Sequence, residues 1–185
     1  IFKQPNYYIM KKLLLIIVIL VTSFTGFSQG NGLYGIRAGI NISNLDFEPA
    51  PLFGNTHRNG LAFGFFAEFD LNGSFSIMPE IQYSSEGAKE KELRVDFLQA
   101  PIFIKYRISD NLFAGAGPVV GVKIHEEGDG FRNFALSGQA GLEFNITEEI
   151  FIDARYTYGF TNLLDEITGY EAKNMNFQFG IGYKM

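Results

Sequence analysis

The two histidines of this chain, His57 and His125, are the natural starting point for metal chemistry, because the sequence contains no cysteine. His125 opens an acidic run in which Glu126, Glu127 and Asp129 follow closely. Imidazole and carboxylate ligands of this kind bind divalent cations, but the spacing matches neither an EF-hand loop nor a zinc motif. Solvated loop charge is the simpler interpretation. We therefore expect no metal site and no cofactor.

Serine hydrolysis is the second chemistry that the residue types permit. A barrel hydrolase needs a serine, a histidine and an acid that converge at one rim. Ser84, Ser85 and Glu86 lie near the end of one predicted strand, whereas His125 follows a strand that is not its neighbour. Nothing in the sequence marks a nucleophile. We therefore expect no catalytic residue and no enzymatic activity, and a lipid-modifying barrel enzyme stays as the weakest alternative.

Charged residues recur instead at alternate positions, opposite an apolar face. The set on this polar face is Arg37, Glu68, Asp70, Glu80, Lys105, Arg107, Lys123, Glu143, Asp153, Arg155 and Lys184. Its bases and acids nearly balance, as a closed interior requires, since buried unpaired charge is costly. The set predicts a structural network of ion pairs. A gating or transport role for Asp153 and Arg155 is the alternative.

The elements that must position these charges are β-strands. From Met175 to Met185 the odd positions are apolar and the even positions are polar or glycine, a strict period of two. The same alternation predicts further strands, and turn residues separate them. The other predicted strands are 33–43, 61–71, 75–84, 93–108, 112–124, 134–146 and 150–161. The predicted short turns are 72–74, 109–111 and 147–149, and the long loops are 44–60, 85–92, 125–133 and 163–174.

This pattern predicts an all-β fold, an eight-stranded antiparallel up-and-down transmembrane β-barrel. Outer-membrane barrels alternate short periplasmic turns with longer external loops, which places both ends of this barrel in the periplasm. A soluble lipocalin-like barrel would alternate too, with its apolar face inward. Glycines on the polar face favour a narrow polar lumen over that alternative. Pro79, Pro101 and Pro118 fall inside strands, where we expect bulges or strand ends.

The N-terminal segment is typical of a cleavable signal peptide. Lys11 and Lys12 precede an apolar run that is too short to span a bilayer, which takes about 20 residues. We place the boundary after residue 28, with Met10 as the start, so that 29–185 form the barrel. Removal of 1–28 takes three lysines and no acid from a chain of formal charge −5. Such an acidic exported chain is a poor candidate for nucleic acid binding.

Several segments resemble the PorT-like small outer-membrane β-barrel family of Bacteroidota. They are MPEIQYSSEG (78–87), VDFLQAPIFIKY (95–106), AGAGPVVG (114–121), DARYTYGFTN (153–162) and FQFGIGYKM (177–185). The resemblance implies an outer-membrane location and a C-terminal strand that the barrel assembly machinery reads. Such strands usually end in an aromatic residue, whereas this one ends in Met185 with Tyr183 two places earlier. The family name also suggests a link to type IX secretion.

We expect from this a non-enzymatic integral barrel in the outer membrane. Its partners would be outer-membrane lipids and, through the external loops, proteins of an envelope or secretion complex that it supports as a scaffold or accessory. The alternative is a conduit for small solutes or hydrophobic ligands, with porin-like transport. That alternative requires an open lumen or a gap between strands.

Overall fold

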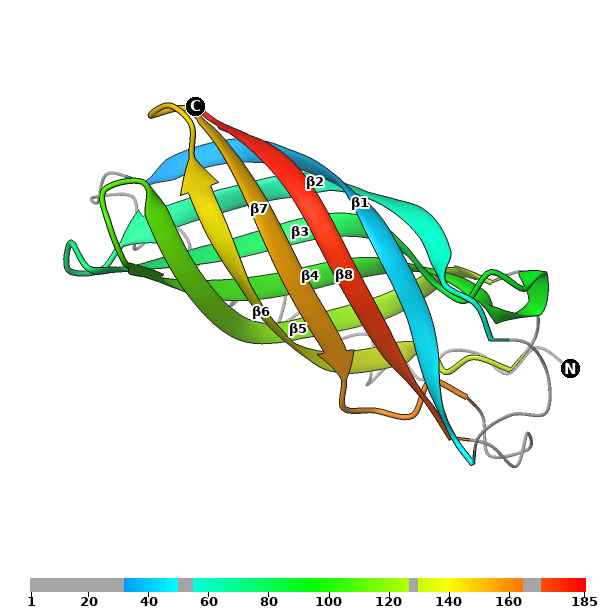
Figure 1. Ribbon diagram of the computed structural model, residues 1–185. Helices are drawn as coiled ribbons and strands as arrows, with labels where there is room; N and C mark the ends of the chain where they lie inside the picture. The colour runs from blue at the N-terminus through cyan, green and yellow to red at the C-terminus, as the bar shows by residue number, and fades with distance from the viewer. Residues whose placement is uncertain (1–31, 50–54, 127–129, 165–170) are drawn as a thin grey trace, which may run out of the picture. The chain divides into compact units, whose positions relative to one another are not determined.

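The computed structural model describes residues 32–49, 55–126, 130–164 and 171–185, which form a closed barrel. Eight strands follow one another around the barrel in chain order, and each pairs antiparallel with its neighbours (Figure 1). They are β1 (Leu33–Glu48), β2 (Arg58–Asp70), β3 (Phe75–Gly87), β4 (Arg94–Arg107), β5 (Leu112–Glu126), β6 (Phe134–Asn145), β7 (Ile150–Gly159) and β8 (Glu171–Lys184). A 3₁₀ turn, η1 (Lys91–Leu93), precedes β4. The predicted fold class is confirmed. The predicted signal peptide, 1–28, lies outside the described residues.

Tight turns and long connections alternate around the barrel, as predicted. The turns after β2, β4 and β6 lie at the end that also carries the C-terminus, and the longer connections lie at the other end (Figure 1). We call these the turn end and the loop end. In the part of the chain that the structure describes, no helix is long and apolar enough to span a bilayer.

Several strands run farther toward the loop end than the alternation of apolar residues predicted. β1 continues to Glu48, β3 continues to Gly87, and β8 already begins at Glu171. Backbone pairing causes the extension, because Glu48 pairs with Glu171 and every residue between them and the turn end continues the ladder. A ladder requires only amides and carbonyls, so it persists where the side chains no longer alternate.

The expectation of bulges or strand ends at the three prolines is wrong. Pro79, Pro101 and Pro118 all lie within strands whose register is the same on both sides of the proline. Each coincides with a gap of two residue pairs in one ladder, in β2–β3, β3–β4 and β4–β5 respectively. The missing N–H removes pairing locally without inserting a residue. The register shift instead lies between Asp96 and Phe97.

The apolar face of the sheet points outward. Phe65 is 69% exposed and Ile81 is 61% exposed, whereas Arg37 on the opposite face is 4% exposed. A soluble barrel would have the reverse arrangement. Aromatic residues border the apolar surface, as interfacial girdles do in membrane barrels. They include Tyr34, Tyr106 and Tyr183 toward the turn end, and Tyr83 and Tyr158 toward the loop end.

Candidate functional site: the filled lumen and the loop-end rim

A ring of four charges crosses the lumen near the turn end. Glu68 comes from β2, Lys105 from β4, Glu143 from β6 and Lys184 from β8, so acid and base alternate around the barrel. The Lys105 Nζ lies 2.6 Å from a Glu68 oxygen and 2.8 Å from a Glu143 oxygen. The corresponding distances from the Lys184 Nζ are 3.2 and 3.3 Å. Because β2 and β6 are opposite strands, these lysines occupy the barrel axis.

A second charged layer is built on two arginines. The Arg37 Nε donates to Asp153 at 2.6 Å, and its Nη2 also bonds that carboxylate, which makes the pair bidentate. The Arg155 Nη1 lies 2.6 Å from Glu80 Oε1, a contact that joins β7 to the opposite strand β3. Arg37 also donates to Gln178 at 2.6 Å. Fork-shaped guanidinium groups suit such fixed pairing.

Aromatic rings fill the space between these charges. Phe66, Met78, Phe103 and Phe151 form a buried cluster. The Arg155 guanidinium lies 4.6 Å from the Phe103 ring centroid, and the Lys184 ammonium lies 5.1 Å from that of Phe151. These cation–π contacts add to the ion pairs of the buried interior.

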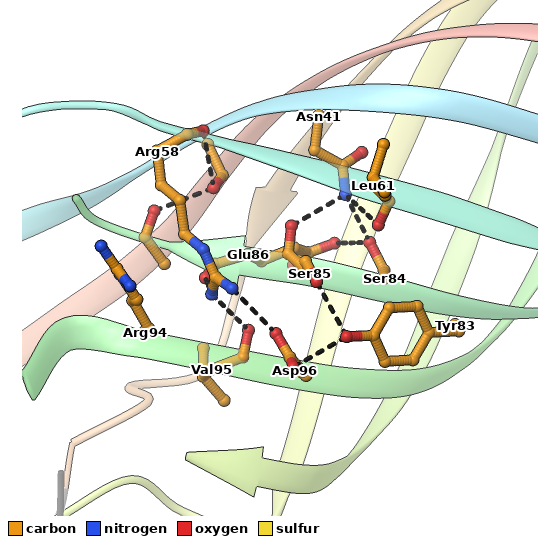
Figure 2. Close-up of polar contacts among 12 residues, drawn as sticks. Asn41, Arg58, Leu61, Tyr83, Ser84, Ser85, Glu86, Arg94, Val95 and Asp96 are labelled. Carbon is orange, nitrogen blue, oxygen red and sulfur yellow. Dashed lines mark hydrogen bonds and ion pairs between the residues drawn. The ribbon is translucent and has the colours of Figure 1, made fainter. Parts of the chain in front are cut away.

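Toward the loop end, the charged layers give way to amides that surround one carboxylate. Glu86 is 1% exposed. Its Oε1 accepts from the Ser84 hydroxyl at 2.7 Å and from the Gln99 amide at 2.9 Å. The Asn174 amide donates to Oε2 at 2.5 Å, so that strands β3, β4 and β8 meet at this side chain. Asn41 on β1 joins the layer by donating to Ser84 at 2.9 Å (Figure 2).

An apolar cluster lies at the loop end of the interior. Two of its members, Phe131 and Leu164, form an isolated backbone bridge that ties the segment after β5 to the one after β7. The backbone amide of Arg132 also donates a hydrogen bond to the Leu163 carbonyl oxygen at 2.7 Å, which strengthens the connection between these segments. The buried members are Leu45, Ala88, Val95, Phe97, Phe131, Ala135, Leu163, Leu164 and Ala172. We call this cluster the apolar cap.

Three residues of the predicted charge set lie elsewhere. Asp70 is the exposed last residue of β2, and its Oδ1 accepts a hydrogen bond from the backbone amide of Gly73 in the following turn at 2.7 Å. Arg107 is exposed at the turn end, with its guanidinium 5.5 Å from the Phe113 ring. Lys123 is partly buried near the apolar cap and donates to the Phe131 carbonyl at 2.6 Å. Alternation continues to the last residue of a strand, so it cannot separate lumen positions from the barrel mouths.

The polar residues at the loop end of the interior were not predicted from the sequence as lumen residues. Glu86 fell in a predicted loop, although it continues the inward series of Glu80, Gln82 and Ser84 at every second position. That continuation was the available signal. No comparable signal marks the rim network in Figure 2, where Arg58 Nη2 donates to Asp96 at 3.2 Å and the Tyr83 hydroxyl donates to the same carboxylate at 2.8 Å.

Among the residues that the structure describes, the candidates for hydrolysis and metal binding do not form a reactive arrangement. Ser85 pairs with Asp96, and Asp96 pairs with His125, so the acid lies between the serine and the histidine. A catalytic triad requires the histidine in that middle place. Glu126 is engaged in an ion pair with Lys123. Glu127 and Asp129 lie outside the described residues.

The comparisons with known proteins agree with this geometry. The model of the outer membrane protein beta-barrel domain family matches residues 13–184. The chain belongs to this family. It is therefore an outer-membrane protein, and the outward apolar face is the surface that contacts lipid. No protein with a curated description matches the chain.

Solved structures of small outer-membrane barrels resemble the whole domain. Neisserial surface protein A (NspA) superposes with a TM-score of 0.59 at 11% identity, over 82% of this chain and 97% of that protein. Ail of Yersinia pestis, in complex with the heparin analogue sucrose octasulfate, has a TM-score of 0.48 at 22% identity, over 83% and 99%. OprG from Pseudomonas aeruginosa has a TM-score of 0.44 at 14% identity, over 84% and 97%. The likeness to NspA shows the fold alone.

Proposed function

We propose that this protein is a non-conducting, non-enzymatic scaffold of the outer membrane, which presents its loop end to an envelope or secretion complex. One observation carries the proposal: ammonium groups from β4 and β8 contact carboxylates from the opposite strands β2 and β6 on the barrel axis. Eight strands leave an interior that side chains can fill. The arginine layer and the apolar cap occupy two further levels.

The alternative of a conduit for solutes or hydrophobic ligands requires an open lumen or a lateral gap. Pairing between neighbouring strands continues around the whole barrel, including β1 with β8. The ladder between β1 and β8, which closes the barrel, runs from the Gly35–Lys184 pair to the Glu48–Glu171 pair. These features support a closed scaffold over a conduit.

Conductance in planar lipid bilayers tests the closed state. Refolded protein should give no steady channels, whereas a general porin in the same bilayers supplies the positive control. Insertion is verified separately by the protease resistance of the barrel in vesicles of the same lipid. Steady single-channel steps from inserted wild-type protein would contradict the scaffold.

Partner binding tests the second half of the proposal. The resemblance to PorT-like barrels suggests an accessory of a type IX-like secretion complex, and barrels of this orientation expose their long connections outside the cell. Replacement of 127–129 and 165–170 by glycine-serine segments of equal length should abolish co-purification of that complex. The matched control replaces the turn 72–74 at the opposite end. Equal co-purification of both variants would exclude the loop end as the contact surface.

A further inference from the structure

An apolar cleft lies on the outward face of the barrel, where β8, β1 and β2 run side by side. We call it the outer cleft. It has a volume of about 460 Å³. Small-molecule sites in proteins typically measure about 300 to 1,000 Å³, so the outer cleft has the size of a binding site. The outward-facing side chains that line it include Ile36, Ala38, Phe63, Phe65, Ile181 and Tyr183.

One small side chain among large ones creates this depression. Ala38 on β1 pairs with Phe63 on β2 and with Ile181 on β8. Phe63 is 58% exposed and Ile181 is 54% exposed, so both side chains stand out from the sheet. Directly opposite residues on one face of a sheet have Cβ atoms about 5 Å apart. The methyl group of Ala38 therefore forms the floor of a recess between two large apolar walls.

The outer cleft is closed toward the lumen. At its base, Arg37 pairs with Gly64 on one side and with Gly182 on the other. An added Cβ on Gly182 would overlap the ring of Phe151, so that ring packs against the inner side of the strand. The Arg37 guanidinium is held within the lumen by Asp153. The cleft is therefore a recess on the lipid side of the wall and not an opening through it.

The outer cleft lies at the depth of the periplasmic leaflet. Tyr183 belongs to the aromatic girdle toward the turn end, which is the periplasmic end in barrels of this kind. Ile181 lies two residues farther from that end, and two residues span about 7 Å of strand. At a strand tilt of about 40° this is ~5 Å along the membrane normal. Half of the hydrocarbon core is about 15 Å thick, so the cleft lies within its periplasmic half.

We propose that the outer cleft binds one acyl chain of a phospholipid in the periplasmic leaflet. The cleft is continuous with the lipid-facing surface, so lipid chains are the molecules that reach it. Lipid chains are as apolar as the side chains that they touch, so burial alone favours no particular place on the barrel. A chain in the cleft contacts protein on three sides, whereas a chain on a flat part of the barrel contacts it on one. These additional dispersion contacts hold one chain more firmly than its neighbours.

Fluorescence quenching tests the proposal, because the sequence contains no tryptophan and one introduced indole reports on its own surroundings. Phe65→Trp places the indole on the wall of the cleft. The matched reporter is Leu142→Trp, which places it at an exposed position on β6, the strand opposite β2. Both refolded variants, in detergent micelles, are titrated with a phosphatidylcholine whose acyl chain carries two bromine atoms. Bromine quenches indole fluorescence on contact.

Half-maximal quenching of the Phe65→Trp variant should require about fivefold less lipid than that of the Leu142→Trp variant. Vesicles made entirely of the brominated lipid give the full quenching of each indole and normalise the two titrations. Equal lipid requirements would overturn the proposal, because both reporters would then detect ordinary contact with lipid.

A second variant fills the outer cleft. Ala38→Leu, added to Phe65→Trp, should raise the lipid requirement to that of the Leu142→Trp variant. The matched control is Ala100→Leu, the same change at an exposed position on β4, and it should leave the requirement within about twofold. Heat-shifted gel bands verify that both variants fold. A folded Ala38→Leu variant that keeps the fivefold preference would refute the assignment of the chain to this cleft.

A second copy of the barrel is the other occupant that an apolar recess could take. Light scattering of the protein in detergent distinguishes it from a lipid. Lipid binding predicts the same oligomeric mass for the wild type and for Ala38→Leu. A wild-type dimer that Ala38→Leu converts to a monomer would overturn the assignment to lipid and identify the outer cleft as an interface between copies.

Discussion

Among single residues, Arg155 joins ion pairs and an aromatic ring in the middle of the interior. It is 2% exposed, contacts Glu80 and Asp153, and stacks on Phe103. A buried ion pair adds little net stability, because the cost of desolvating both charges opposes their attraction. Loss of one partner, however, leaves the other charge buried and unpaired. The ion pair is therefore more important for selecting one arrangement of side chains in the lumen than for increasing the total stability of the protein.

Arg155→Met should lower the free energy of unfolding by about 3 to 5 kcal/mol, because Glu80 would stay buried without this partner. Urea titration of vesicle-inserted protein, followed by the heat-modifiable gel band, measures the change. Arg107→Met removes an exposed arginine and should cost less than about 1 kcal/mol. The double variant Glu80→Leu/Arg155→Met should recover most of the loss. A loss below that of Arg107→Met would contradict the burial argument.

Glu86 offers a second test at this scale, through hydrogen bonds and not through ion pairs. Glu86→Ala leaves the donors of Ser84, Gln99 and Asn174 without their acceptor, so we expect a loss of about 3 kcal/mol. Glu86→Gln should recover much of this, since the Oδ1 of Asn174, which accepts no hydrogen bond within the described residues, can turn toward the new amide. Glu92→Ala, at an exposed position, is the control. Similar urea midpoints for the Glu86→Ala and Glu92→Ala variants would argue against the amide layer.

The sequence predicted which face each of these residues occupies, but not which partner it meets. Alternation assigns Lys105 and Glu143 to the lumen, and both contact each other across β5. Their pairing depends on the stagger between strands, which no local pattern encodes. The rim was harder to predict still, because Arg58 on β2 and Asp96 on β4 are brought together across β3 by two ladders.

At the scale of elements, the ladder between β4 and β5 combines a missing donor with a close backbone approach. Pro118 interrupts its pairing, and at Gly117 an added Cβ would overlap the Ile102 carbonyl oxygen. Only glycine lets the two strands keep this separation. The glycine-rich composition of β5 is therefore a requirement of strand spacing as well as of lumen volume.

Gly117→Ala should lower the free energy of unfolding by about 1 to 3 kcal/mol, because β4 and β5 must separate to admit the methyl group. Gly121 lies on the same strand and face, but its added Cβ would meet Gln99 Cγ at an ordinary 3.5 Å. Gly121→Ala should stabilise by about 0.4 to 1 kcal/mol, through the reduced freedom of the unfolded chain. The same urea titration compares them, and changes of equal sign would refute the strand-spacing argument.

The strand ends were the least predictable part of the elements. The predicted first strand ends at Ser43, before a predicted polar loop, 44–60, that includes Asn44 and Asp46. In the structure these residues continue the ladder with β8, and Leu45 between them enters the apolar cap. The polarity of a side chain indicates contact with solvent but does not indicate whether its backbone is paired. A ladder that extends beyond the membrane edge can have one face in contact with water.

For the molecule as a whole, a closed ladder around every strand implies resistance to detergent. The chain from Gln29, refolded into detergent, should migrate differently on a cold SDS gel before and after boiling, because SDS unfolds closed barrels slowly at low temperature. Circular dichroism should show β-structure in the unboiled sample. Protein that shows no shift and stays soluble without detergent would mean that the apolar face does not contact lipid.

The pairing of β1 with β8 closes the barrel, and Gly35 faces Lys184 at its turn end. Because both strand ends lie at this same end, a pulling force applied between Leu33 and Lys184 loads the hydrogen bonds of the seam one pair at a time. The seam would open like a zipper, at a lower force than shearing all pairs together would need. The seam is therefore mechanically weak toward a force applied at the turn end, although it contains a long continuous ladder. A pull on the two ends of the chain should unravel the barrel strand by strand, beginning at β1 and β8.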